Sequence, residues 1–382
     1  MIDETIKKAI KLEDCLSKGS NNDFPSNHPE KSYLERYKEM ESKFNEYPVE
    51  LGALVAGVEK WLTDAKEKME KVIKAGNSDL KHTDIKKIFD GDPIVFLNRH
   101  DGKHTQKVQE RVLMLLQHFE PCVLNYYELF LLMCATVVHD VGNIFGRSEH
   151  EKDIKRVLDA QCADILPDSV ERRIIARVAR AHGGLIGESQ DTISVLQEEA
   201  LVNNIPVRER LLAAILRFAD ELSDDSSRAN YAALNSEIIK KASLIYHLYS
   251  ASLHTVSLHK NEISNTYEIV LAYEFDTKTA CLKLDKEGYE QYLIDEIYNR
   301  TFKMDRERRY CVRHLRPYIR LERIKVSISI TSSKDEFIYY PITYTLEENG
   351  YPAEIYKTIK DVDKKILSGE EIVCKLQEKG GL

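Results

Sequence analysis

The sequence lacks several features that would assign it to particular classes of protein. Its seven cysteines are scattered along 382 residues and include no C-x-x-C pair. An odd, scattered set argues against a disulfide framework and is typical of reduced thiols in a cytosolic protein. The longest apolar run, residues 129–138, is far shorter than the roughly 20 residues needed to cross a bilayer.

Positive charge is also in short supply. Lysine and arginine number 55 against 63 aspartates and glutamates, which gives a formal net charge of −8. No global positive field therefore draws the chain to nucleic acid or to an anionic membrane. Residues 1–20 form a short amphipathic pattern that carries acids, unlike a signal peptide. We therefore expect a cytoplasmic protein with no membrane partner.

The spacing of apolar residues predicts the architecture. A hydrophobic fraction of 43% is enough for a full core, and the length indicates about two domains. Apolar residues recur every three or four positions in 33–75 and through much of 103–250, as in amphipathic helices. Alternating patterns at 253–275 and 319–346 predict strands. We predict a mainly α fold with three parts: an N-terminal helical region at 1–85, a helical bundle at 86–250 and a small α+β domain at 251–382.

Ionisable residues stand at the ends of the predicted apolar helices. The stretch "ATVVHDVGN" closes the most apolar helix on a histidine and an aspartate, and three further helices begin or end in the same way. Burying such groups without partners is costly, and shared coordination of a cation removes the cost. The candidate metal ligands are His104, His139, Asp140, His182 and Asp220.

The mixture of donors narrows the choice of metal. Imidazole combined with carboxylate favours Mn, Fe, Co, Ni or Zn over Mg or Ca. No cysteine lies near these positions, which argues against a closed structural zinc site. We expect one or two divalent transition-metal ions, with Mg as the alternative.

The order of these residues resembles a known family. His104, the His139-Asp140 pair and Asp220 follow the pattern of the HD superfamily of metal-dependent phosphohydrolases. The phrases "HDVGN", "AHGG" and "LRFADELSDDSSR" are most similar to the HD domains of bacterial conflict and anti-phage systems. The resemblance covers residues 95–230 and makes the predicted bundle an HD domain. It implies that these four residues hold the first metal.

The resemblance also suggests catalytic roles and one departure from them. His182 matches an extra histidine that some HD enzymes use for a second metal or for proton transfer; the alternative is a histidine that ends a helix before Gly183-Gly184. HD enzymes that hydrolyse deoxynucleoside triphosphates have a histidine-rich loop where this chain reads "HDVGNIFGRSEHE". His150 is a candidate replacement, or an ordinary polar residue at a helix start. The catalytic candidates are thus Asp140, His150 and His182.

The expected chemistry is attack on phosphate by water that a metal activates. Arginine matches phosphate geometry, and the candidates for substrate binding are Arg147, Arg180 and Arg228, each with an alternative role as a surface or helix-capping partner. The leading hypothesis is a hydrolase of a free nucleotide, such as a (d)NTP, that acts in phage defence.

A local basic segment leaves other functions open. Residues 306–325 carry seven arginines interleaved with tyrosines, a combination that binds single-stranded nucleic acid. The same arginines could instead pair with the many glutamates, or form a nucleotide-sensing or subunit contact in a homo-oligomer. The alternatives are therefore a nuclease acting on single-stranded DNA or RNA and a non-catalytic nucleotide sensor.

Overall fold

The computed structural model describes the chain in twelve segments: residues 16, 31–45, 102–117, 123–142, 150–202, 204–229, 234, 241–286, 288–316, 318–332, 341–348 and 356–378. Most of the predicted N-terminal region, together with Arg147, lies outside them.

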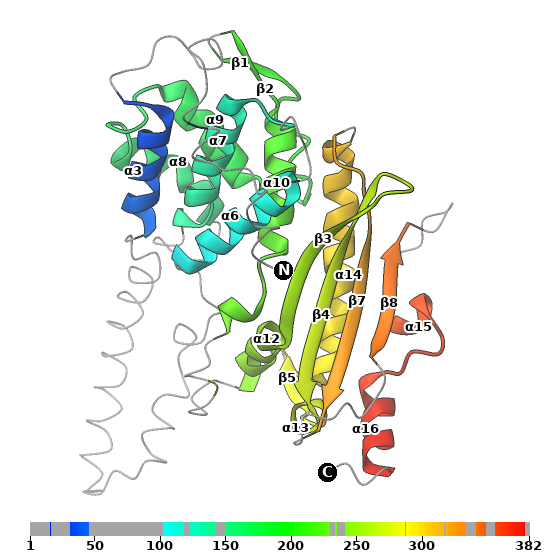
Figure 1. The fold of residues 1–382 in the computed structure, drawn as a ribbon. Helices are drawn as coiled ribbons and strands as arrows, with labels where there is room; N and C mark the ends of the chain where they lie inside the picture. The colour runs from blue at the N-terminus through cyan, green and yellow to red at the C-terminus, as the bar shows by residue number, and fades with distance from the viewer. Residues whose placement is uncertain are drawn as a thin grey trace, which may run out of the picture.

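Among the described residues of the first half of the chain, six helices form a bundle (Figure 1). They are α3 (Tyr33–Asn45), α6 (Gly102–Leu116), α7 (Tyr126–Val138), α8 (Ile154–Gln161), α9 (Ser169–Arg180) and α10 (Glu209–Glu221). Two 3₁₀ turns, η3 (His150–Lys152) and η4 (Ser226–Arg228), and a short antiparallel hairpin of β1 (Ala200–Val202) and β2 (Ile205–Val207) complete it.

Helix α7 lies at the centre of the bundle. Every residue from Tyr127 to Val138 is buried, as expected of a helix that is apolar all round. Its start is fixed by a capping box, in which the Asn125 side chain accepts from the Glu128 amide and Glu128 accepts from the Asn125 amide. Because α7 is fixed at this end, the residues after Val138 emerge at a defined place in the bundle.

A buried ion pair connects α3 with the other helices of the bundle. The Arg36 guanidinium donates to Glu171 over 2.5 Å, and the two side chains are 1% and 0% exposed. The Tyr127 hydroxyl donates to the other oxygen of Glu171 over 2.9 Å, and Arg36 also donates to the Ile165 carbonyl. The carboxylate is thus satisfied by two helices at once.

The second half of the chain is built on a sheet. Its elements are α12 (Lys241–Ser252), β3 (Leu253–Asn261), β4 (Thr266–Asp276), α13 (Thr277–Ala280), β5 (Leu284–Lys286), β6 (Tyr289–Gln291), α14 (Leu293–Leu315), β7 (Leu321–Thr331), β8 (Ile342–Glu347), α15 (Ile359–Val362) and α16 (Gly369–Glu378). The sheet order is β3-β4-β7-β8, with β4 and β7 parallel and the other pairs antiparallel. The long helix α14 packs along this sheet and also against α10 of the bundle (Figure 1).

The prediction of a mainly α fold is wrong. A four-stranded mixed sheet covered by α14 makes the chain mixed α/β. Both alternating segments were identified as strands, but the alternation did not reveal that β4 and β7, far apart in sequence, pair side by side along ten residues each. The domain boundaries stay predictions; residue 85 lies outside the described residues, and residue 250 falls within α12.

Candidate metal centre

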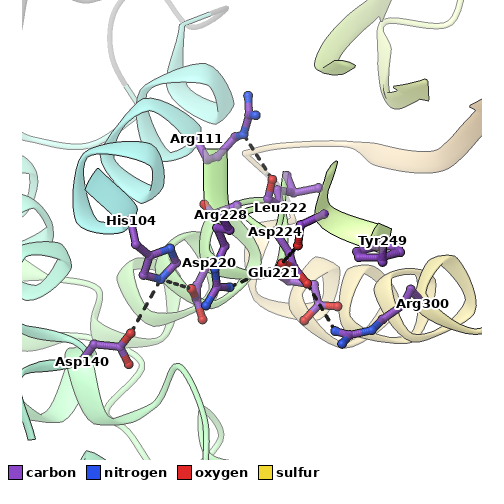
Figure 2. Close-up of polar contacts among 12 residues, drawn as sticks. His104, Arg111, Asp140, Asp220, Glu221, Leu222, Asp224, Arg228, Tyr249 and Arg300 are labelled. Atoms are coloured by element: carbon purple, nitrogen blue, oxygen red, sulfur yellow. Dashed lines mark hydrogen bonds and ion pairs between the residues drawn. The ribbon is translucent and has the colours of Figure 1, made fainter. Parts of the chain in front are cut away.

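Five predicted ligands meet where the bundle helices end (Figure 2 shows three of them). His104 lies in the first turn of α6, and His139 is the C-cap of α7, followed by Asp140. His182 comes directly after the C-cap of α9, and Asp220 lies in the last turn of α10. The ends of four helices therefore lie close together.

The donor atoms lie at spacings that a shared ion requires. His104 Nε2 is 3.2 Å from Asp220 Oδ1 and 3.7 Å from Asp140 Oδ2. His139 Nε2 is 3.5 Å from Asp140 Oδ2 and 3.7 Å from Asp220 Oδ1. Ligand atoms each about 2.1 Å from one ion lie roughly 3 to 3.5 Å apart, so these spacings suit coordination of a shared ion. The His104–Asp220 contact at 3.2 Å is also within hydrogen-bond range.

In the tautomer that its hydrogen bond requires, His139 has its lone pair on Nε2, which faces the site. Its Nδ1 donates to the Thr136 carbonyl over 2.8 Å, which leaves Nε2 as the atom that can bind a cation. The side chain is 0% exposed, and Nε2 has no hydrogen-bond partner within the described part of the chain. A buried acceptor of this kind fits a metal, which would satisfy it.

His182 is oriented in the same way. Its Nδ1 donates to the Ala179 carbonyl over 2.6 Å, and its Nε2 lies 3.7 Å from Asp140 Oδ1. The rings of His139 and His182 meet edge to face with centroids 5.1 Å apart. His182 thus faces the oxygen of Asp140 opposite the one that faces His104 and His139.

Burial sets the charge of the ligands. It lowers the pKa of His104 to about 4, and the nearby Arg228 guanidinium acts in the same direction. The imidazole is therefore neutral at pH 7, which is the form that binds metal. Burial alone would raise the pKa of Asp220, but the hydrogen bond with His104 lowers it, and the overall shift is downward, so that Asp220 stays a carboxylate. The group formed by His104, His139 and Asp220 is able to hold a divalent ion.

The segment that follows Asp220 is held by side chains from both halves of the chain (Figure 2). Glu221 accepts from Lys303 over 2.6 Å, and Asp224 pairs with Arg300 over 3.3 Å; both cations are on α14. From the other side, Arg111 of α6 donates to the Leu222 carbonyl over 3.2 Å. The sheet half thus helps to position a ligand of the bundle half.

A polar cavity of about 230 Å³ opens beside the centre. His182 and Asp220 line it, together with Arg217, Lys303 and Glu307. Arg217 is bound by Glu307 through two hydrogen bonds of 2.7 and 2.9 Å. Sequence reasoning missed both cations, although an arginine one turn before Asp220 in an apolar helix is a signal for Arg217. Nothing near Lys303 in the sequence points to the centre.

The other predicted site residues are placed as follows. Arg228 lies in η4, 3.8 Å from Asp224 and close enough to lower the pKa of His104. Arg180 is exposed at the end of α9. His150 begins η3, and Arg147 is outside the described residues. The catalytic and substrate-binding roles of these residues stay predictions.

The basic segment 306–325 spreads over several environments. Arg308 is buried and donates to Asp305 and to the Leu321 carbonyl, whereas Arg306 is exposed. Arg323 pairs with Glu268 over 3.0 Å. Binding of single-stranded nucleic acid by this segment stays a prediction.

The loop after His182 depends on one glycine. Gly184 has φ of +76°, where an L side chain is strained, and a Cβ there would lie 2.3 Å from Glu151 Oε1. We expect Gly184→Ala to lower the free energy of unfolding by about 1–2 kcal/mol. Gly183→Ala is the matched control, since a Cβ at Gly183 meets nothing within 4 Å. Equal urea midpoints for the two variants would contradict this account of the loop.

In the described residues, no helix is both long and apolar enough to span a membrane.

Comparison with known proteins gives one match. A family model described as HD-CE matches residues 83–300, more than half of the chain and a range that includes all five ionisable residues of the centre. No curated protein and no solved structure matches the sequence.

Proposed function

Because the chain belongs to the HD-CE family, we propose that it is a metal-dependent hydrolase that cleaves a phosphate ester or anhydride of a nucleotide, with a (d)NTP as the leading substrate. The observation that carries the proposal is the convergence of imidazole and carboxylate donors at four helix ends. This donor set suits a divalent transition metal.

Each part of the centre has a role in this proposal. His104, His139, Asp140 and Asp220 would hold the ion, which when bound supplies Lewis acidity to a phosphate and activates water. Arg217 and Lys303 line the adjoining cavity and offer charge to phosphate oxygens. His182 Nε2, which faces Asp140 Oδ1, is placed to accept or return a proton.

Metal content is the first test. We expect about one transition-metal ion per chain in the purified wild type, measured by elemental analysis, and its loss in Asp140→Ala because a ligand shared by three histidines is removed. Asp164→Ala, at an exposed aspartate, is the control and keeps the ion. The proposal would be contradicted if the wild type stays free of metal after reconstitution with Mn, Fe, Co, Ni or Zn.

The products then decide among hydrolytic functions. With Mn, Co, Ni or Mg, the wild type releases phosphate or triphosphate from a panel of NTPs and dNTPs. Shortening of an end-labelled single strand instead supports a nuclease, and saturable nucleotide binding without turnover supports a sensor. The motif resemblance extends the proposal to phage defence, for which loss of protection in cells that carry Asp140→Ala is the test.

A further inference from the structure

A second, larger cavity lies on the sheet half of the molecule. It has a volume of about 710 Å³, within the range of small-molecule sites, and lies between α12, β5, α14 and the chain at 356–357. Its polar lining is dominated by five cations: Lys286, Arg300, Lys303, Arg306 and Lys357. We refer to it as the basic cavity.

The cations of the basic cavity outnumber the carboxylates that neutralise them. Lys286 and Arg300 share Glu296, at 2.6 and 3.0 Å. Arg300 also reaches Asp224, and Lys303 pairs with Glu221. Three carboxylates therefore serve three cations.

The remaining two cations supply the excess. Arg306 and Lys357 are exposed and form no ion pair within the described segments. No acidic residue of the described chain lines the cavity. In a protein with a net charge of −8, this cavity thus carries more cations than ion-paired carboxylates among the described residues.

Aromatic rings lie beside these charges. The half-buried Tyr246 lines the cavity and lies under the Arg300 guanidinium, 5.2 Å from the ring centroid, with Lys286 at 6.0 Å. Phe302 and Tyr356, whose ring centroids are 6.0 Å apart, also line the cavity. A planar ring can stack on such surfaces while the cations hold attached phosphates.

We propose that the basic cavity is a binding site for a phosphorylated ligand that carries a planar ring, of the chemical class of a nucleoside polyphosphate, and that it is separate from the metal centre. The phosphates contact Arg306, Lys357 and Lys303, and the ring packs against Tyr246. The inference requires no hydrolysis and does not rest on the proposed function.

Lys303 connects the basic cavity with the cavity beside the metal centre, because it lines both. Phosphate bound in the basic cavity competes with Glu221 for Lys303 and with Asp224 for Arg300. Since both carboxylates follow Asp220 closely, the bound ligand acts on the segment that carries a metal ligand.

Calorimetry on the full chain treated with chelator tests the site without metal. The probes are inorganic tripolyphosphate and ATP. We expect both probes to bind. In the double variant Arg306→Gln, Lys357→Gln, we expect the affinity for each probe to fall by about 10-fold or more. The charge-matched control is Arg313→Gln, Lys278→Gln, which removes two exposed cations outside the cavity and leaves affinity within about 2-fold of the wild type.

Three outcomes would overturn the proposed phosphate site. The first is that neither probe binds, and the second is that both double variants lose the same amount of affinity. The third is that Asp140→Asn loses binding, which would place the phosphates at the metal centre. The ring contact has its own test: ATP binds more tightly than tripolyphosphate, and Tyr246→Leu removes the difference. Equal affinity of the wild type for the two probes contradicts a ring site. An enzyme that hydrolyses nothing would leave these binding results intact.

Discussion

We expect the replacement of Asp220 with asparagine to lower the proposed nucleotide hydrolysis by a factor on the order of 10³. The side chain keeps its shape but loses the charge that faces His104 Nε2 at 3.2 Å and His139 Nε2 at 3.7 Å. An amide is a poor ligand for a transition metal, and its NH₂ group cannot approach a cation. The metal centre therefore loses its occupancy while the helix that carries residue 220 keeps its packing.

The measurement is product release at saturating metal, with metal content determined on the same sample. Asp164→Asn, at an exposed position, is the control and keeps full activity. Circular dichroism of Asp220→Asn shows the wild-type helix content if the residue acts as a ligand. Unchanged turnover in Asp220→Asn would exclude it from the metal centre.

Replacing Arg36 with methionine destabilises the chain by about 3–5 kcal/mol. The substitution removes the guanidinium that pairs with the Glu171 carboxylate, which is 0% exposed, and leaves the hydrogen bond from the Tyr127 hydroxyl in place. A buried charge that has lost its counter-ion is far costlier than the pair is favourable. Helix α3 loses its attachment to α9 at the same time.

Chemical denaturation measures the loss, and a second substitution tests its cause. Arg36→Met combined with Glu171→Gln removes both charges, and we expect it to recover a substantial part of the lost stability. Lys155→Met breaks the exposed pair of Lys155 with Asp159 and changes stability little. A double variant as unstable as the sum of its two single variants would show that the cost does not come from the unpaired charge.

The candidate metal ligands were predictable because each belongs to a local pattern. A histidine or aspartate that begins or ends a helix is visible in a short stretch of sequence, and the structure brings His104, His139 and Asp220 together as expected. The most apolar helix was predicted to end on the histidine of "ATVVHDVGN", and α7 is found at Tyr126–Val138 with His139 as its C-cap. Local rules therefore identified the centre without knowledge of the fold.

The contribution of α14 could not be predicted in this way. Lys303 lies far along the chain from Asp220, and it reaches the centre only because α14 packs against α10. The same applies to the basic cavity, whose lining comes from four separate elements. Such sites depend on how distant segments pack, which no periodicity encodes.

The parallel pairing of β4 with β7 also imposes an order on how the protein is made. Strand β3 can form a hairpin with β4 as soon as both have left the ribosome, since a short turn joins them. The other edge of β4 pairs with β7, and β7 is synthesised only after residues 277–320, which include all of α14. Until then a long edge rich in apolar side chains is open to strands of other chains. We therefore expect a nascent or truncated chain that stops before residue 321 to aggregate more readily than the full chain.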